Sequence, residues 1–222
     1  TGNFTTVNVP TPVVQNGALA GATVVDISAG ADHCLARTAD GKLIAWGWNA
    51  NGQLGINSRS DQYTPQLVNG FGALTADKVV VAMRVVRYHS LALTSDGSLY
   101  AWGRNDYGQL GSGDYASTNV PVAVPLPSGS AMASYSIAAT SGVTQQRSML
   151  LSTAGELFSA GYMSNGQIGD GGTGIQASPT ALPASAFGNR SVAALMGGGG
   201  YPAHAAALTQ EGSLFLWGYN GN

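Results

Sequence analysis

Two stretches of the chain repeat one pattern, His33-Cys-Leu-Ala-Arg-Thr-Ala-Asp-Gly-Lys-Leu-Ile-Ala-Trp-Gly-Trp-Asn-Ala-Asn-Gly-Gln-Leu-Gly55 and His89-Ser-Leu-Ala-Leu-Thr-Ser-Asp-Gly-Ser-Leu-Tyr-Ala-Trp-Gly-Arg-Asn-Asp-Tyr-Gly-Gln-Leu-Gly111. The second follows the first by 56 residues at every position. A weaker third copy starts at Arg147, and a fourth starts at His204. The four copies account for the whole chain, so the sequence indicates a repeat architecture.

Each copy consists of short apolar runs separated by turn residues. In the second copy, residues 91–93 and 99–102 flank Asp96-Gly97, and two apolar runs around Asp-Gly are a strong hairpin signal. A segment that begins with proline closes the first three units, at Pro65, Pro121 and Pro179. Proline in a short strand favours the edge of a sheet, because it cannot donate a ladder hydrogen bond. The pattern predicts four short strands per copy and no helix of any length.

A four-stranded sheet with two apolar faces is best covered by neighbours arranged radially around an axis. The sequence therefore predicts an all-β fold, a β-propeller built of four-stranded antiparallel blades. We expect a single propeller domain over residues 1–222, with repeats over about 1–55, 56–111, 112–169 and 170–222. The four repeats form either a partial or a small closed propeller. Residues 10–14 resemble the closing strands and are expected to pair in register with a blade-ending strand.

The repeat also carries a family resemblance. The pattern Gly-x-x-His-Ser-Leu-Ala-Leu-Thr-x-Asp-Gly-x-Leu-Tyr-Ala-Trp-Gly-x-Asn-x-x-Gly-Gln-Leu-Gly resembles the regulator-of-chromosome-condensation repeat, and residues 89–111 match it nearly throughout. The third copy departs from it, with Arg147 in place of the histidine and Ala160 in place of the tryptophan. The resemblance implies β-propeller blades, of which family members usually close seven, so the chain is expected to belong to a longer array.

Composition narrows the classes of partner. Only 9% of the 222 residues are charged, the net charge is −2, and the nine basic residues form no stripe, so nucleic-acid binding is disfavoured. No apolar run reaches the roughly 20 residues of a membrane helix. Few lysines and glutamates with many Gly, Ser, Thr and Asn favour a secreted or cell-surface protein, with a cytoplasmic one as the alternative. Because the chain starts at Thr1, we expect it to be processed or excised.

Residues with chemical potential occupy repeated structural positions. The three histidines His33, His89 and His204 share one repeat position, which favours a structural role bonding local backbone over a metal site. Cys34 aligns with small residues on an apolar strand and is expected to be a buried, inert thiol. Asp40, Asp96 and Glu211 stand in hairpin turns and Trp46, Trp102 and Trp217 in inter-blade packing positions.

The remaining motifs argue against catalysis. Residues 169–174 match a Gly-x-Gly-x-x-Gly string, but Pro179 follows it too soon for a helix, so the segment is a blade connection. No Gly-x-Ser-x-Gly nucleophile elbow is present in the sequence. With no catalytic constellation left, the sequence predicts a protein that is not an enzyme and uses no cofactor or metal.

Variable positions indicate where a partner would bind. In an antiparallel blade, the loops after the first and third strands lie at the same end of the sheet, which we call the rim. These loops are the segments that differ most between copies. Trp48 also stands at a variable position, where the other copies are expected to carry Arg104, Met163 and Tyr219. Because tyrosine, tryptophan and arginine are enriched at binding hot spots, the predicted partner-binding residues are Trp48, Tyr63, Arg87, Tyr88, Tyr115 and Tyr201.

The favoured function is a non-enzymatic propeller that binds another protein or a cell-surface component through this rim. Self-association through propeller edge strands is a further possibility, because an unpaired edge invites pairing. Two alternatives stay open. The family resemblance implies nucleotide exchange on a small GTPase, although no inserted charged hairpin is evident. A carbohydrate-binding or lyase-type propeller would use the central pore and would need converging carboxylates or aromatics.

Overall fold

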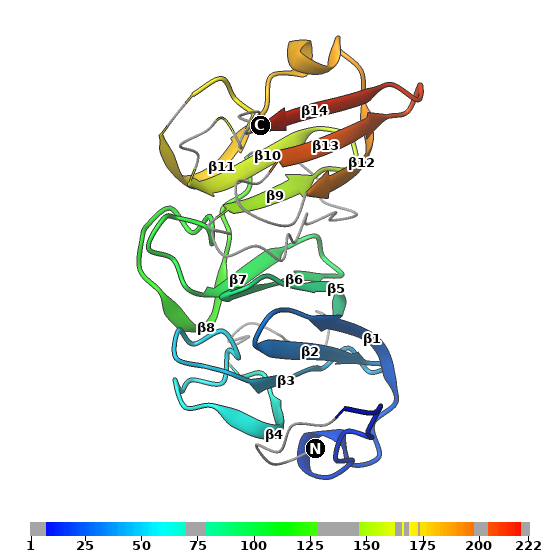
Figure 1. Ribbon diagram of the computed structural model, residues 1–222, viewed down its shortest axis with the longest axis vertical. Coiled ribbons are helices and arrows are strands. Elements are labelled where there is room, and N and C mark those ends of the chain that lie inside the picture. Colours follow the sequence, from blue (N-terminus) through cyan, green and yellow to red (C-terminus); the bar gives the residue numbers. More distant parts are fainter. Residues whose placement is uncertain are drawn as a thin grey trace.

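The computed structural model describes residues 8–69, 79–127, 147–162, 166, 169–172, 174–197 and 204–218. Within them the chain forms antiparallel sheets that stack in chain order along the long axis of the molecule (Figure 1). We call these sheets blades 1 to 4. Blade 1 comprises β1 (Val24–Ala29), β2 (His33–Thr38), β3 (Leu43–Gly47) and β4 (Gln62–Leu67). Blade 2 comprises β5 (Val80–Val85), β6 (His89–Thr94), β7 (Leu99–Gly103) and β8 (Thr118–Ala123).

The other two blades show three strands each in the described part of the chain. Blade 3 comprises β9 (Arg147–Leu151), β10 (Leu157–Tyr162) and β11 (Ile175–Ala181). Blade 4 comprises β12 (Val192–Gly197), β13 (His204–Thr209) and β14 (Leu214–Gly218). Two 3-10 turns, η1 (Gly17–Leu19) and η2 (Ala184–Phe187), are the helical segments of these ranges. The prediction of an all-β fold is confirmed, and the first strand expected for blade 3 lies outside the described residues.

The Asp-Gly hairpins join the second and third strands as predicted. In blade 2, Gly97 has a φ of +81° and its N–H bonds the carbonyl of Thr94 at 2.9 Å. Asp96 accepts the Thr94 hydroxyl at 2.6 Å and the Ser98 N–H at 3.1 Å, which satisfies the polar groups of the turn. In blade 1, hydrogen bonds from Lys42 and Thr38 lower the pKa of Asp40 to about 2. These aspartates therefore stabilise turns.

The proline-containing strands lie at the outer edge of their sheets. β4, β8 and β11 each pair on one side only, with the third strand of their blade. The register shifts opposite the prolines, for example between Ala45 and Gly47 in blade 1. Such an irregularity tolerates Pro65, which cannot donate a ladder hydrogen bond.

One prediction about strand pairing is wrong. Residues 10–14 form no strand, whereas we expected them to pair in register with a blade-ending strand. Pro10 and Pro12 remove two of the N–H donors that a ladder needs. Instead, Val13 packs against the cluster of Leu19, Ala36 and Ile44, on the face of blade 1 that points away from blade 2. We call this face the back of the blade and the opposite face its front.

The core lies between blades, where the front of one sheet meets the back of the next. Trp102 is fully buried between blades 1 and 2, and its indole N–H donates to the carbonyl of Gln53 at 2.9 Å. Gly55 lies beneath this ring, where an added Cβ would come within 2.7 Å of the indole nitrogen. At the next junction Ala160 replaces tryptophan, and the ring of Pro179 lies over Gly111 instead. Trp102 thus has the predicted inter-blade role.

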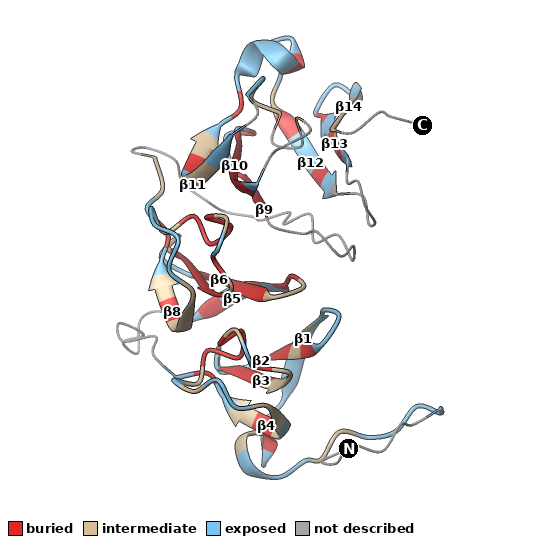
Figure 2. Cartoon of the chain, turned by 60° about the vertical axis from the view of Figure 1, so that its left-hand side comes forward, coloured by how far each residue is buried: buried red, intermediate tan, exposed pale blue. Residues whose placement is uncertain are grey.

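The two outer blades expose apolar faces that the inner blades bury. Leu214 and Leu216 on the front of blade 4 are 64% and 66% exposed, whereas their repeat equivalents Leu99 and Ala101 are buried against blade 3. On the back of blade 1, Ile27 is 73% exposed, whereas the equivalent Met83 is buried. Figure 2 shows the same contrast between the buried inner strands of blade 2 and β14. Both outer faces therefore have the composition of a blade-to-blade surface.

Candidate functional site: an aromatic and arginine row on one rim

Hydrogen bonds hold the loops after the first and third strands together on one rim. The backbone N–H of Trp48 donates to the carbonyl of Asp32, and that of Arg104 donates to the carbonyl of Tyr88, both at 2.8 Å. The preceding Gly103 has a φ of +108°, and a Cβ there would come within 2.5 Å of the Tyr88 carbonyl oxygen. Glycine is thus required where the third strand crosses the first loop. This crossing places Trp48 and Arg104, the residues after the glycine in blades 1 and 2, on the rim.

A continuous row of side chains runs along this rim from blade 1 to blade 3. The Trp48 and Tyr88 rings meet edge to face, with centroids 5.5 Å apart. The Arg104 guanidinium lies 5.6 Å from the centroid of Tyr88 and 6.0 Å from that of Tyr107, which in turn meets Tyr162 at 5.2 Å. Arg87 lies 4.8 Å from the Tyr88 ring. We call this set the aromatic–arginine row: Trp48, Arg87, Tyr88, Arg104, Tyr107 and Tyr162.

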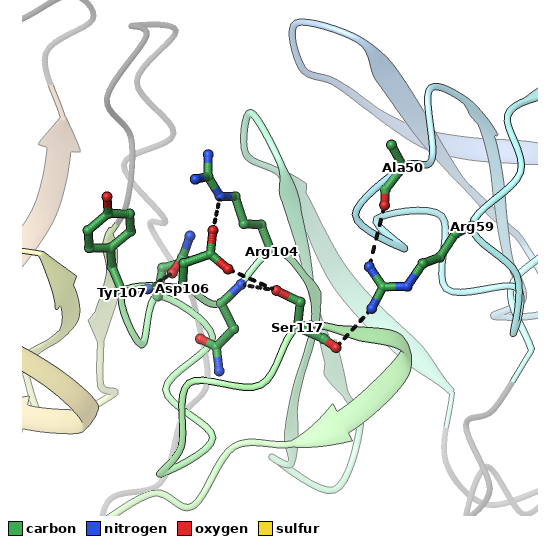
Figure 3. Close-up of polar contacts among 8 residues, drawn as sticks. Ala50, Arg59, Arg104, Asp106, Tyr107 and Ser117 are labelled. Atoms are coloured by element: carbon green, nitrogen blue, oxygen red, sulfur yellow. Dashed lines mark hydrogen bonds and ion pairs between the residues drawn. The ribbon is translucent and has the colours of Figure 1, made fainter.

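A polar network fixes the loops that carry the row. Arg104 pairs with Asp106 at 2.6 Å, and the Ser117 hydroxyl reaches Asp106 at 3.5 Å (Figure 3). Arg59 of blade 1 donates to the Ser117 carbonyl of blade 2 at 3.1 Å and to the Ala50 carbonyl at 3.4 Å. Loops of two blades are therefore tied to each other, which keeps the rim in one arrangement.

Buried asparagines brace the same loops from within. In blade 2, the Asn105 side chain donates to the carbonyl of Asp114 at 3.0 Å and accepts the Leu110 N–H at 2.9 Å. Asn49 repeats this arrangement in blade 1, where it accepts the Leu54 N–H at 3.0 Å. The Asn-x-x-Gly-Gln-Leu-Gly part of the repeat therefore shapes the loop, and the variable residues inside it face outward.

The structure brings together three of the six predicted partner-binding residues. Trp48, Arg87 and Tyr88 belong to the row. Tyr63 lies on the edge strand β4 with 38% of its surface exposed. Tyr115 lies in the loop between β7 and β8, is 54% exposed, and makes no ring contact with any described residue. Tyr201 lies outside the described residues.

Sequence reasoning missed Arg104, Tyr107 and Tyr162 as members of the row. A signal for two of them was present, because Arg104 and Tyr162 follow the glycine of the third strand, as Trp48 does. Aligning the third copy on Gly161 would have found Tyr162 despite the missing tryptophan. Tyr107 had no such signal, since its contacts depend on how blades 2 and 3 meet.

The histidines have a structural role that differs in detail from the prediction. His33 reaches the Ser90 hydroxyl of the next blade at 2.8 Å, and His89 reaches that of Ser148 at 3.0 Å, so the bonds link blades and not local backbone. Burial lowers the pKa of both imidazoles to about 3. Cys34 is half-buried and not fully buried as predicted, and its partial burial raises the pKa of the thiol.

The glycine-rich segment falls where it was expected. Residues 169–172 and 174 lead into the strand β11 and not into a helix, which fits a blade connection. No group of three or more metal-ligating side chains occurs among the described residues. No helix in the described ranges is long and apolar enough to cross a membrane.

Stacked antiparallel blades with a variable rim and a repeated internal frame define a β-propeller repeat protein. Residues 40–93 and 96–144 match the regulator of chromosome condensation (RCC1) repeat, and residues 24–53 and 80–109 match a second description of the same repeat. The chain therefore belongs to the RCC1 repeat family, as its resemblance implied.

Named relatives share the repeat over nearly the whole chain. The chain is 32% identical to the ultraviolet-B receptor UVR8 of Arabidopsis thaliana over 99% of its own length and 46% of that protein. It is 33% identical to the probable E3 ubiquitin-protein ligase HERC6 of Homo sapiens, over 89% of this chain and 18% of that protein. The chain thus spans less than half the length of these relatives.

Solved structures agree with the fold. The crystal structure of human WBSCR16 superposes with a TM-score of 0.75 at 27% identity, covering 93% of this chain and 50% of that one. Prp20p from Saccharomyces cerevisiae superposes with a TM-score of 0.70 at 25% identity, covering 89% of this chain and 46% of that one. The blades of this chain are therefore arranged as in established propellers of the family.

Proposed function

We propose that this chain is a non-enzymatic interaction module that binds another protein through the aromatic–arginine row. The observation that carries the proposal is the row itself, which presents partly exposed aromatic and guanidinium groups from three blades on a braced rim. Residues of this type supply most of the binding energy at protein interfaces. The rigid loops support it further, because ordering a mobile loop on binding costs free energy.

The relatives support a protein partner by analogy. The structure of Prp20p was described together with its binding to Gsp1p and histones, so a propeller of this family can serve as a protein-binding surface. The expected location, secreted or at the cell surface, remains a proposal that rests on composition. Sequencing the parent open reading frame tests it, because a secretory signal would support the location and its absence would count against it.

Affinity measurements on variants test the proposed surface. A partner captured from an extract of the source organism is purified, and its affinity is compared for the parent chain, Trp48→Ala and Tyr88→Ala. We expect each substitution to weaken binding roughly thirtyfold, as for a hot-spot residue. Lys42→Ala on the opposite rim is the control and should bind as the parent does. All variants are checked for an unchanged thermal midpoint.

Two results taken together would contradict the proposed binding surface. Unchanged affinity for Trp48→Ala and Tyr88→Ala, with a loss on changing the Asp40 or Asp96 turns, would place the binding surface on the other rim.

A further inference from the structure

The charged groups around the row are mostly satisfied by the chain itself. Arg104 is paired with Asp106 at 2.6 Å, and Arg59 donates to two loop carbonyls. The Asp61 carboxylate accepts the backbone N–H of Asn49 at 2.8 Å. These groups brace the rim, and each already has at least one partner within the chain.

Arg87 differs from these groups. It forms no ion pair or hydrogen bond with any residue that the structure describes, and its Nε is buried without an acceptor. Its guanidinium lies 4.8 Å from the centroid of the Tyr88 ring, beside the edge-to-face contact of Tyr88 with Trp48. Its two terminal nitrogens also lack an acceptor among the described residues but, unlike Nε, are not buried, so an acceptor from another molecule can reach them without breaking an existing bond.

No carboxylate in the described part of the chain fills this role. Ten of its eleven acidic residues lie in the described ranges, and none pairs with Arg87. Asp106 is committed to Arg104. Arg87 is therefore available to an acceptor on another molecule.

We propose that Arg87 anchors an acidic segment of the partner protein, in which an aspartate or glutamate stands next to an apolar or aromatic residue. This inference rests on the proposed function of the row. A guanidinium held against a ring presents its N–H groups as a planar fork that matches a carboxylate. Trp48 and Tyr88 would pack against the neighbouring apolar side chain.

A phosphate polymer fits this site less well. Binding a nucleic acid depends on several free cations that neutralise successive phosphates. Along the row Arg87 is free but Arg104 is neutralised by Asp106, and the chain as a whole carries a net charge of −2. A single carboxylate needs only one such cation.

Selection from a random dodecamer peptide library tests the inference on the chain as it is. Peptides are selected on the parent chain, and those that no longer bind Trp48→Ala or Tyr88→Ala are kept as ligands of the row. We expect these to be enriched in Asp or Glu beside an apolar residue. Arg87→Gln should weaken them roughly tenfold or more, and Arg87→Lys should weaken them less, because it keeps the charge but loses the fork.

The outcomes distinguish the role of Arg87 from the proposed binding function of the aromatic–arginine row. Row-dependent peptides that lack acidic residues, or that bind Arg87→Gln as tightly as the parent, overturn the role of Arg87 and leave the row as a binding surface. A library with no row-dependent peptide counts against both. Binding of a twenty-residue thymidine oligonucleotide that is lost in Arg87→Gln would overturn the assignment to an acidic protein segment.

Discussion

At the junction between blades 1 and 2 a buried imidazole meets a serine, whereas at the junction between blades 3 and 4 a guanidinium meets a backbone carbonyl. Ser90 donates its hydroxyl to the Gln53 carbonyl at 2.8 Å, so it accepts the Nε2–H of His33. Blade 4 has Ala205 at the serine position, and blade 3 has Arg147, whose guanidinium donates to the His204 carbonyl at 3.2 Å. Arg147 and Ala205, the two residues that depart from the repeat, thus both lie at the junction between blades 3 and 4.

The tryptophan is also more deeply buried at the junction between blades 1 and 2 than at the junction between blades 3 and 4. Trp102 is fully buried at the first junction, whereas Trp217 at the last is only partly buried and contacts Phe187 with centroids 6.0 Å apart. The comparison predicts that the residues at one junction are energetically coupled, because a lost partner on one blade is matched by a changed residue on the next. The first junction should also contribute more to stability than the last.

Removal of the two indoles gives the largest expected effect. Trp102→Ala should lower the free energy of unfolding by roughly 3–5 kcal/mol, because it leaves a cavity and strips the Gln53 carbonyl of a donor. Trp217→Ala should cost roughly 1–3 kcal/mol, since part of the indole already faces solvent. Urea unfolding of both variants measures the difference. Equal losses would contradict the ranking of the junctions.

Acid should weaken the first two junctions through their histidines. Burial lowers the pKa of His33 and His89 from 6.5 to about 3, so between these values the unfolded chain binds more protons than the folded one. Stability is then fully present above pH 6.5 and falls as the pH falls towards 3. From pH 7 to pH 5 we expect a loss of about 2 kcal/mol per histidine, measured by urea unfolding.

Single variants identify the source of that slope. His33→Gln and His89→Gln should each remove about half of the pH dependence. Asp40 does not interfere, because its pKa is lowered from 3.8 to about 2. Its contribution to stability is lost only as the pH falls below 3.8, outside the measured range from pH 7 to pH 5. A slope that persists in the variant with both glutamines would assign the acid sensitivity to other groups.

The fold was largely predictable because its signals are local and repeated. The Asp-Gly hairpins, the prolines of the edge strands and the alternation of apolar runs each depend on a few neighbouring residues. Residues 10–14 were mispredicted because their pattern matched a closing strand, although Pro10 and Pro12 deprive it of donors. The prediction rested on the similarity of the sequence pattern and did not count the N–H donors that the segment can supply.

The site was only partly predictable because it forms between blades. Trp48 and Tyr88 were recognised from residue type and variability. Their contact with each other, and that of Tyr107 with Tyr162, depends on the stacking of successive blades, which no single copy encodes. The same holds for His33, whose bond partner Ser90 lies on the next blade and not on local backbone.

Exchange of the junction residues gives the smallest and most specific expected effect. Arg147→His should leave the His204 carbonyl without its donor and the imidazole facing a methyl group. Ala205→Ser alone should place a hydroxyl at a fully buried position beside the guanidinium. The double variant restores the pair seen as His89 with Ser148, so it should be more stable than the sum of the singles by about 1 kcal/mol.

The reverse exchange at the middle junction is the matched control. His89→Arg with Ser148→Ala installs the residues of the last junction between blades 2 and 3, and its coupling should have the same sign, because both cycles remove a mismatched pair of partners. Additivity within about 0.3–0.5 kcal/mol in both cycles would mean that the two departures coincide without interacting. Coupling in the first cycle alone would instead tie the effect to the surroundings of Arg147, whose burial lowers its pKa to about 10.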